Sequence, residues 1–367
     1  MNWVLILVFK HYNQCEMIAR DHHKGGKNMS TPKYKMEFIE LSKQSELGEL
    51  ISNPFSVTGG HLHRVYSPET TTGKYIVKLL NPNIMIRQNA VFNYINSEKI
   101  AQLAAENIPA LPAEKRNGNS LQNINGQFYL VFKWVDAISL GISEIDISHC
   151  RIIGGILAGI HQTDFSELKV VQEKVSNEKT AEWSTYLQRG REMGVEWTDL
   201  LHETLQDIIE WDLESQAARE AMSSGLIISH RDLEPKNVLW QSDIPLLIDW
   251  ESAGYIHSAQ DLLETAIYWS KNATGEIIQQ KFASFLSGYK EKCQDDLQAD
   301  WNMVIASSFS GKLGWLEYNL KRSLWIECKD EEEQKLGTVQ VIETIYELRK
   351  YAMQIPDLSQ WLDSYLE

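Results

Sequence analysis

The chain has 367 residues, a hydrophobic content of 43% and a net charge of −15 at pH 7, values typical of a soluble globular protein with more than one core. So acidic a chain disfavours nucleic acid as a partner. The charge is uneven: residues 1–136 carry a net +4, and residues 137–367 carry a net −19. A positively charged first part favours the binding of nucleotide phosphates, and a negatively charged second part favours the binding of a cationic small molecule. A solubilising acidic surface explains the negative charge of the second part equally well.

The four cysteines lie far apart in the sequence and form no Cys-x-x-Cys pair. No histidine stands near any of them at the spacing that a zinc site needs. We therefore expect reduced thiols in a cytoplasmic protein, with neither a disulfide nor a zinc site.

The sequence of residues 1–36 indicates an N-terminal extension. We expect this extension either to be disordered or to result from an incorrectly assigned start codon, with Met29 and Met36 as alternative starts. The apolar run over residues 3–9 is too short to span a bilayer, and no basic segment precedes it. We assign this segment no function and expect no membrane contact.

Residues 37–136 predict a sheet lobe that binds nucleotide. Gly59 and Gly60 fall between two strand-like segments, where a glycine pair lets backbone amides approach phosphate oxygens. An ordinary hairpin turn would look the same. The lysine of the next strand strengthens the prediction.

Lys78 stands inside the alternating apolar run over residues 74–80, where a charge is costly unless it is paired. The following helix, over residues 88–107, places Glu98 near its middle and Glu106 next to its end. We predict that Glu98 pairs with Lys78, and that Lys78 also contacts nucleotide phosphates.

Residues 227–251 carry the strongest signal in the chain. They read as a strand, a polar loop, a short strand, a turn over residues 242–245 and a further strand. This hairpin brings together Asp232, Asn237 and Asp249. Transfer of a phosphoryl group needs a carboxylate that deprotonates the acceptor hydroxyl and hard oxygen ligands that bind Mg²⁺. We predict Asp232 as the base and the other two as metal ligands, although any one of them alone is more often structural.

Residues 137–367 predict a mainly helical lobe. The segment 166–225 is rich in tryptophan and acid, which fits either a pocket for a polyamine or sugar or core aromatics with solvated acids. The other helices are expected at residues 147–164, 276–292, 297–327 and 333–352, with a short last piece around 358–362.

In order, these motifs resemble the aminoglycoside phosphotransferase and choline kinase family, which has a protein-kinase-like fold. His-Arg-Asp-Leu-x-x-x-Asn at residues 230–237 matches the catalytic-loop template of kinases, and Ile-Asp-Trp-Glu follows at residues 248–251. The resemblance covers about residues 40–300. It implies an α+β fold with two lobes: a five-stranded antiparallel sheet with one main helix, and a larger helical lobe.

The resemblance also implies ATP or GTP as co-substrate in the cleft between the lobes, with Mg²⁺. It places the interlobe hinge at residues 136–140, where backbone groups would bind the nucleotide base. We also expect Phe132 and Trp134, on the strand before the hinge, to lie beside the nucleotide. Asp261 matches a structural acid that braces the catalytic loop.

The sequence departs from the patterns of related kinases in three places. Arg231 looks more like protein kinases, and Glu234 stands where a histidine or lysine is commoner. That acid would repel the transferring phosphate unless Lys236 or Arg231 offsets it. Trp250-Glu251 replaces the Phe-Gly of protein kinases and removes the glycine that lets their loop flip, so we expect a metal site that is constitutively assembled.

The resemblance implies an O-phosphotransferase for a small, cationic acceptor. We favour an aminoglycoside-like antibiotic, with choline, homoserine or a ketosamine as the alternative. A nucleotide-binding pseudokinase is less favoured because Lys78, Asp232 and Asp249 are all present. Phosphorylation of proteins is disfavoured because no Ala-Pro-Glu motif follows Asp249, and we expect no protein partner.

Overall fold

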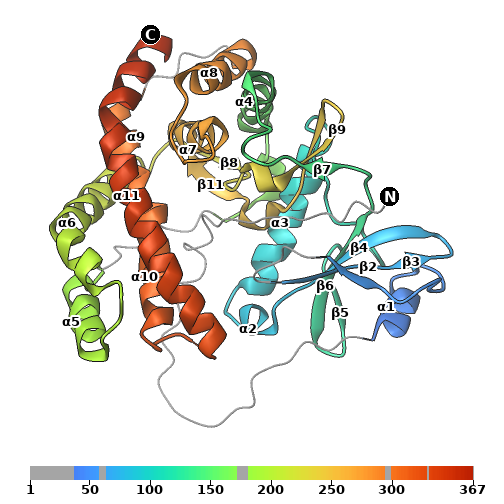
Figure 1. The fold of residues 1–367 in the computed structure, drawn as a ribbon. Helices are drawn as coiled ribbons and strands as arrows, with labels where there is room; N and C mark the ends of the chain where they lie inside the picture. Colours follow the sequence, from blue (N-terminus) through green and yellow to red (C-terminus); the bar gives the residue numbers. More distant parts are fainter. Residues whose placement is uncertain (1–36, 58–62, 172–180, 294–298, 329, 367) are drawn as a thin grey trace.

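The computed structural model describes residues 37–57, 63–171, 181–293, 299–328 and 330–366. The predicted extension over residues 1–36 and the Gly59-Gly60 loop lie outside these residues. Within them, an antiparallel sheet lobe stands beside a larger helical lobe (Figure 1). This is the α+β, two-lobed architecture that the sequence predicted.

The sheet of the first lobe has six strands instead of the five that we predicted, in the order β1-β2-β4-β6-β5 with β3 pairing to β4. Lys78 lies on the central strand β4, opposite Leu130 of β6. Its neighbours Val77 and Leu79 are buried on the other face of the sheet, because successive side chains of a strand alternate. The strands are β1 (Phe55–Val57), β2 (Arg64–Ser67), β3 (Glu69–Thr70), β4 (Gly73–Leu79), β5 (Gln122–Ile124) and β6 (Gln127–Lys133).

Helix α3 (Ala90–Ala104) is the main helix of this lobe, as predicted, and α1 (Phe38–Gln44) and α2 (Pro82–Met85) are short. The chain leaves α3 in an extended conformation that pairs with the second lobe. There Leu111 N–H donates to the carbonyl of Leu247 at 2.8 Å, and Leu247 N–H donates to that of Pro109 at 2.7 Å. The main helix is thereby connected to the segment that carries the predicted catalytic residues.

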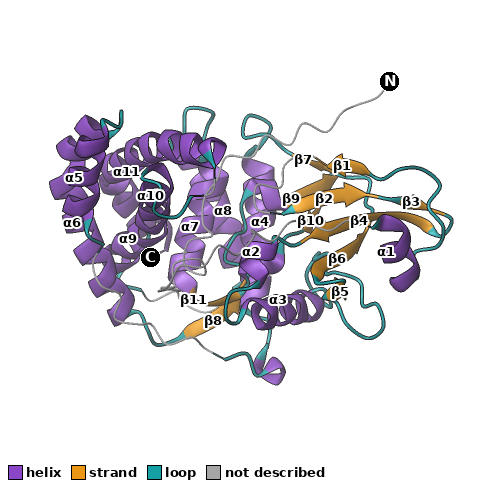
Figure 2. Cartoon of the chain, turned by 90° about the horizontal axis from the view of Figure 1, so that it is seen from below, coloured by secondary structure: helices purple, strands orange, loops and turns teal. Residues whose placement is uncertain are grey.

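Two small sheets lie where the lobes meet (Figure 2). One has the order β10-β9-β7 and the other pairs β11 with β8. Since β7 directly follows the connection from the first lobe, its pairing with β9 fixes that connection against the catalytic hairpin. The strands are β7 (Ile138–Ser139), β8 (Leu226–Ser229), β9 (Val238–Gln241), β10 (Ile244–Leu247) and β11 (Gly254–His257).

The helices of the second lobe are α4 (Ile147–His161), α5 (Trp183–Met193), α6 (Thr198–Ala221), α7 (Ser258–Ser270), α8 (Gln279–Lys292), α9 (Trp301–Ser307), α10 (Phe309–Ser323) and α11 (Glu331–Leu366). Two predictions were wrong here. The segment expected as one helix over residues 297–327 is divided into α9 and α10, and the last two predicted helices are one helix that continues through Pro356. None of the described helices has the length and apolar character that crossing a membrane requires.

Helices α4 and α8 touch along their backbones. A Cβ atom added at Gly154 would lie 2.1 Å from the carbonyl oxygen of Phe285, and one added at Gly288 would lie 2.0 Å from that of Arg151. No real side chain tolerates such distances, so glycine is required at both positions. This contact sets the spacing of the helical core below the catalytic segment.

The aromatic residues of α5 and α6 belong mainly to the core. Trp183 and Trp197 are 2% and 0% exposed, and the indole N–H of Trp183 donates to Asp212 at 2.8 Å. Trp211 stacks on Phe309 with ring centroids 4.9 Å apart. The core interpretation therefore holds for the described tryptophans of this segment.

Candidate active site

The hairpin of the second lobe carries the three predicted catalytic side chains. β8 leads into the loop with Asp232, a 3₁₀ turn holds Asn237 at the start of β9, and the chain reaches Asp249 shortly after β10. Asp249 has a φ of 62°. This left-handed backbone turns the chain sharply into a second 3₁₀ turn, Trp250–Ser252.

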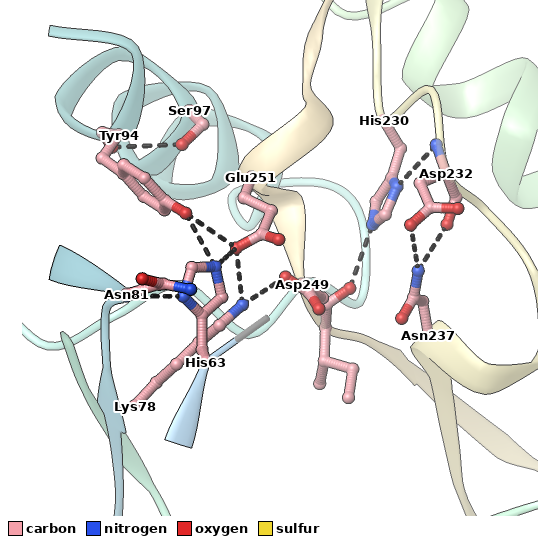
Figure 3. Close-up of polar contacts among 11 residues, drawn as sticks. His63, Lys78, Asn81, Tyr94, Ser97, His230, Asp232, Asn237, Asp249 and Glu251 are labelled. Atoms are coloured by element: carbon pink, nitrogen blue, oxygen red, sulfur yellow. Dashed lines mark hydrogen bonds and ion pairs between the residues drawn. The ribbon is translucent and has the colours of Figure 1, made fainter. Parts of the chain in front are cut away.

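His230 ties the two ends of this segment together (Figure 3). Its Nδ1 accepts the backbone N–H of Asp232 at 3.3 Å, and its Nε2 lies 3.0 Å from the carbonyl oxygen of Ile248. Because Nδ1 accepts, Nε2 must carry the proton and donate it. Burial lowers the pKa of this imidazole, which favours the neutral ring. Asp232, the predicted base, and the residue before Asp249 are thus held at a fixed separation.

Asp232 and Asn237 are in direct contact and both are buried. The Asn237 amide nitrogen donates to the Asp232 carboxylate at 2.9 Å and to its backbone carbonyl at 2.8 Å. Burial raises the pKa of Asp232 well above its usual range, against the effect of nearby Lys236. A carboxylate with a raised pKa is a stronger base, which suits removal of a proton from a hydroxyl.

Lys236 lies between the two acids of the catalytic loop. Its ammonium is 3.5 Å from Asp232 Oδ1 and 3.3 Å from Glu234 Oε1. Both carboxyl groups are nearly buried, so the ion pairs are weakly screened. The unusual acid at position 234 is therefore offset by Lys236, one of the two residues that the sequence suggested for this purpose.

Lys78 reaches from β4 to the catalytic segment. Its ammonium lies 2.7 Å from Asp249 Oδ1 and 2.6 Å from Glu251 Oε2. Burial disfavours the charged ammonium, but these two carboxylates outweigh it and raise the pKa of Lys78 above its ordinary value. The lobes are thus joined by a charged contact at the predicted site.

Glu251 is the centre of a buried polar network in Figure 3. Besides Lys78, its carboxylate lies 3.3 Å from His63 Nε2 and accepts the Tyr94 hydroxyl at 3.4 Å. The backbone N–H of Asn81 donates to the other ring nitrogen of His63. Burial works against the ionised carboxyl, yet the charge of Lys78, with the hydrogen bonds from His63 and Lys78, holds the pKa of Glu251 well below its usual range.

Glu98 does not form the predicted pair with Lys78. Its carboxylate accepts the backbone N–H of Ala113 at 2.7 Å, and the ammonium of Lys78 is taken by Asp249 and Glu251. Burial raises the pKa of Glu98 to about 7. The reason is tertiary: the second 3₁₀ turn of the catalytic segment brings two acids to Lys78, while Glu98 holds the chain that follows α3.

A divalent cation fits the oxygen atoms of this site. Asn237 uses its amide nitrogen on Asp232, which leaves Oδ1 as a ligand, and Asp249 is 33% exposed. The described residues contain no group of three or more His, Cys, Asp or Glu placed to hold a metal ion. A cation here would take its other ligands from nucleotide phosphates and water, as Mg²⁺ usually does.

The remaining predicted nucleotide contacts lie on or near β6. Phe132 packs against the cluster around Leu130 and Met85, and the ring of Trp134 lies under the ammonium of Lys74, 3.2 Å from its centroid. Neither contact involves nucleotide chemistry, so both assignments stay predictions. The sequence missed His63 and Tyr94, because a histidine and a tyrosine without a motif carry no signal.

Two sequence comparisons agree with this geometry. The profile described as "Phosphotransferase enzyme family" matches residues 56–294. A homoserine kinase from Methylorubrum populi is 27% identical over 250 residues, which cover 67% of this chain and 73% of the relative.

Solved structures share the fold at low sequence identity. A spectinomycin phosphotransferase in complex with ADP and spectinomycin has a TM-score of 0.64 at 13% identity. The superposition covers 86% of this chain and 97% of that protein. The choline kinase from Cryptosporidium parvum has a TM-score of 0.54 at 13% identity, and the superposition covers 90% of this chain and 98% of that protein. Likeness at this identity establishes the fold alone, which is the one that the sequence predicted. Since the family profile spans more than half of the chain, the protein belongs to the phosphotransferase enzyme family.

Proposed function

We propose that the protein transfers the γ-phosphoryl group of ATP or GTP to a hydroxyl of a small molecule that carries an amine. The observation that carries this proposal is the pairing of a buried carboxylate, Asp232, with Asn237, on a segment whose other end meets Lys78. This arrangement supplies a base, oxygen ligands and a cation, as phosphoryl transfer requires.

In the proposed reaction, Asp232 accepts the proton of the acceptor hydroxyl. The acceptor oxygen forms a bond to the γ-phosphorus, the bond from that phosphorus to the β,γ-bridging oxygen breaks, and the products are a phosphate monoester and the nucleoside diphosphate. Asn237 and Asp249 would hold Mg²⁺, which neutralises phosphate charge when bound. Lys78 contacts the α/β-phosphates, and Gly59 and Gly60 remain predicted phosphate contacts.

For the acceptor, the homoserine kinase relative supports an amino alcohol. At 27% identity it stands closer in sequence than the solved spectinomycin phosphotransferase and choline kinase, at 12–13%. The aminoglycoside-like acceptor is supported by the net −19 of residues 137–367, which attracts cations. We favour the amino alcohol, because the negative charge of the whole lobe attracts any amine and so does not distinguish an aminoglycoside from an amino alcohol.

The test is nucleotide turnover against a panel of homoserine, choline, ketosamines and aminoglycosides, with mass spectrometry of the products. Asp232→Ala should abolish transfer and leave nucleotide binding nearly intact. Asp249→Ala should weaken binding of the magnesium nucleotide. A fully active Asp232→Ala protein would refute the assignment, and robust transfer to protein substrates would overturn the small-molecule class.

A further inference from the structure

The C-terminal end of α7 is anchored to the catalytic loop. The indole N–H of Trp269, which is fully buried, donates to the carbonyl oxygen of Leu233 at 2.8 Å. Leu233 is the residue between Asp232 and Glu234. The residues around Trp269 are therefore fixed relative to the base, and whatever they bind lies close to the site of transfer.

Two lysines meet at one tyrosine beside this anchor. Tyr268 precedes Trp269, and its ring centroid lies 5.5 Å from the ammonium of Lys271 and 6.0 Å from that of Lys312. Lys312 comes from α10, and its ammonium is also 5.0 Å from the ring centroid of Tyr351 in α11. Three helices thus place two cations around an aromatic pair.

Lys312 is buried, Lys271 is half-buried, and their charges repel each other. Lys312 is 5% exposed. Burial, followed by the charge of Lys271, lowers the pKa of Lys312 to about 8, against the raising effects of Glu264, Glu347 and Glu234. Two positive charges that repel each other away from solvent are stabilised when an anion binds between them.

Acidic groups stand around the same lysines. Glu264 lies on α7 and Glu347 on α11, and Glu234 belongs to the catalytic loop; all three act on the charge of Lys312. The Oε2 atom of Glu347 is buried and accepts no hydrogen bond from the described residues. The cluster therefore presents both signs of charge next to the catalytic loop.

We infer that Lys271 and Lys312 bind the carboxylate of the acceptor, and that the acceptor is a zwitterion: an amino acid whose side chain carries the hydroxyl, with Glu264 and Glu234 facing its ammonium group. This inference rests on the proposed function and names its substrate class. A carboxylate between the two lysines would offset their mutual repulsion, and the acids that act on Lys312 would attract the ammonium group of the same molecule.

The experiment compares three acceptors on the wild-type protein and on charge-removing variants. The acceptors are L-homoserine, its methyl ester, which lacks the negative charge, and 3-aminopropan-1-ol, which lacks the carboxyl group. The variants are Lys312→Met and Lys271→Met, which retain much of the side-chain length. The control is Lys335→Met, on the exposed face of α11, where the lysine side chain is 75% exposed.

In the wild-type and control proteins, kcat/KM should be about 10- to 100-fold higher for homoserine than for the other two acceptors, the usual value of a charge-assisted hydrogen bond. In Lys312→Met and in Lys271→Met, this ratio should fall towards 1, because each variant removes one of the two partners of the carboxylate. A structural role for the lysines would lower the rates for all three acceptors and leave the ratio unchanged.

Calorimetric titration of the wild-type protein with each acceptor keeps the test decisive if the variants do not fold: homoserine should bind about 10-fold or more tightly than its ester. Equal turnover or binding of the three acceptors, or an unchanged ratio in both lysine variants, would overturn the inference. Transfer to choline or aminoglycosides but not to homoserine would overturn it while the proposed function stands. No transfer to any acceptor would refute both.

Discussion

Lys78 is paired with Glu251, whose carboxylate lies 2.6 Å from the lysine ammonium and two residues beyond Asp249 in the chain. An acid of the catalytic segment thus takes the role that the sequence had given to Glu98 of the α3 helix. Each lobe contributes one partner, so the contact aligns the sheet with the predicted metal ligands before any nucleotide binds.

Replacing Glu251 by glutamine should destabilise the protein. The variant leaves Lys78 and His63 in a buried place with one negative charge fewer, and such losses cost about 3 kcal/mol. Because the ionised form of Glu251 is the stabilised one, its contribution is present above pH 4.5 and is lost as the pH falls further. Urea unfolding at pH 8 measures the loss. An unchanged midpoint at equal slope would show that the pair contributes nothing.

Glu98→Gln should have the opposite effect at the same pH. Burial raises the pKa of Glu98 from 4.5 to about 7, so the folded chain binds this proton more tightly than the unfolded chain. The stabilisation is complete below pH 4.5 and is lost as the pH rises to about 7. Glutamine stays neutral and still accepts the Ala113 N–H, so the variant should gain up to about 3 kcal/mol at pH 8.

The matched measurement for Glu98→Gln is its stability from pH 4 to pH 8. The wild-type free energy of unfolding should fall relative to the variant across this range, and the two proteins should be similar near pH 4. Parallel curves for the two proteins would mean that Glu98 does not titrate in the folded state.

The contact between α4 and α8 should not tolerate a methyl group. Gly154→Ala and Gly288→Ala would each place a Cβ about 2 Å from a backbone carbonyl oxygen, which forces the helices apart at a cost of about 3 kcal/mol. Gly155→Ala is the control, since its Cβ would stand 3.3 Å from the nearest atom and alanine favours the helix. Thermal unfolding compares the three variants. Equal midpoints would contradict the close backbone contact.

Trp269→Phe should lower activity more than its effect on stability explains. The variant loses the hydrogen bond to Leu233, leaves a buried carbonyl unsatisfied and loosens the catalytic loop, so we expect a kcat about 10-fold lower and a stability loss of about 2 kcal/mol. Trp197→Phe is the control, because its buried indole also donates one hydrogen bond, to Ser323, away from the loop. Equal kcat values in the two variants would show that Trp269 does not position Asp232.

The catalytic hairpin was readable from the sequence because its information is local. The spacing of Asp232, Asn237 and Asp249, with apolar strands between them, is enough to predict a hairpin that gathers their side chains. In the same way, the alternating run around Lys78 was enough to predict its strand. The structure places Lys78 beside Asp249, as the two-lobed arrangement requires.

What failed depends on contacts between distant segments. Glu98 and Glu251 are both acids near Lys78 in a two-lobed fold, and only the approach of the second 3₁₀ turn decides between them. Lys312 carries no local signal, because the tyrosines and acids around it come from α7 and α11. Pro356 predicts a break, since proline removes a helical hydrogen bond, but the burial of Leu358 and Leu362 keeps α11 continuous.

The contact between Asn237 and Asp232 limits which residues can occupy position 237. Aspartate would offer a metal ion an equally hard oxygen, so coordination chemistry alone would allow either side chain. Yet aspartate has no N–H, and it would set two buried acids 2.9 Å apart in place of a donor and an acceptor. The contact with Asp232, and not the coordination of a metal ion, therefore excludes aspartate at position 237. Natural variation at this position should favour side chains that can donate a hydrogen bond to Asp232.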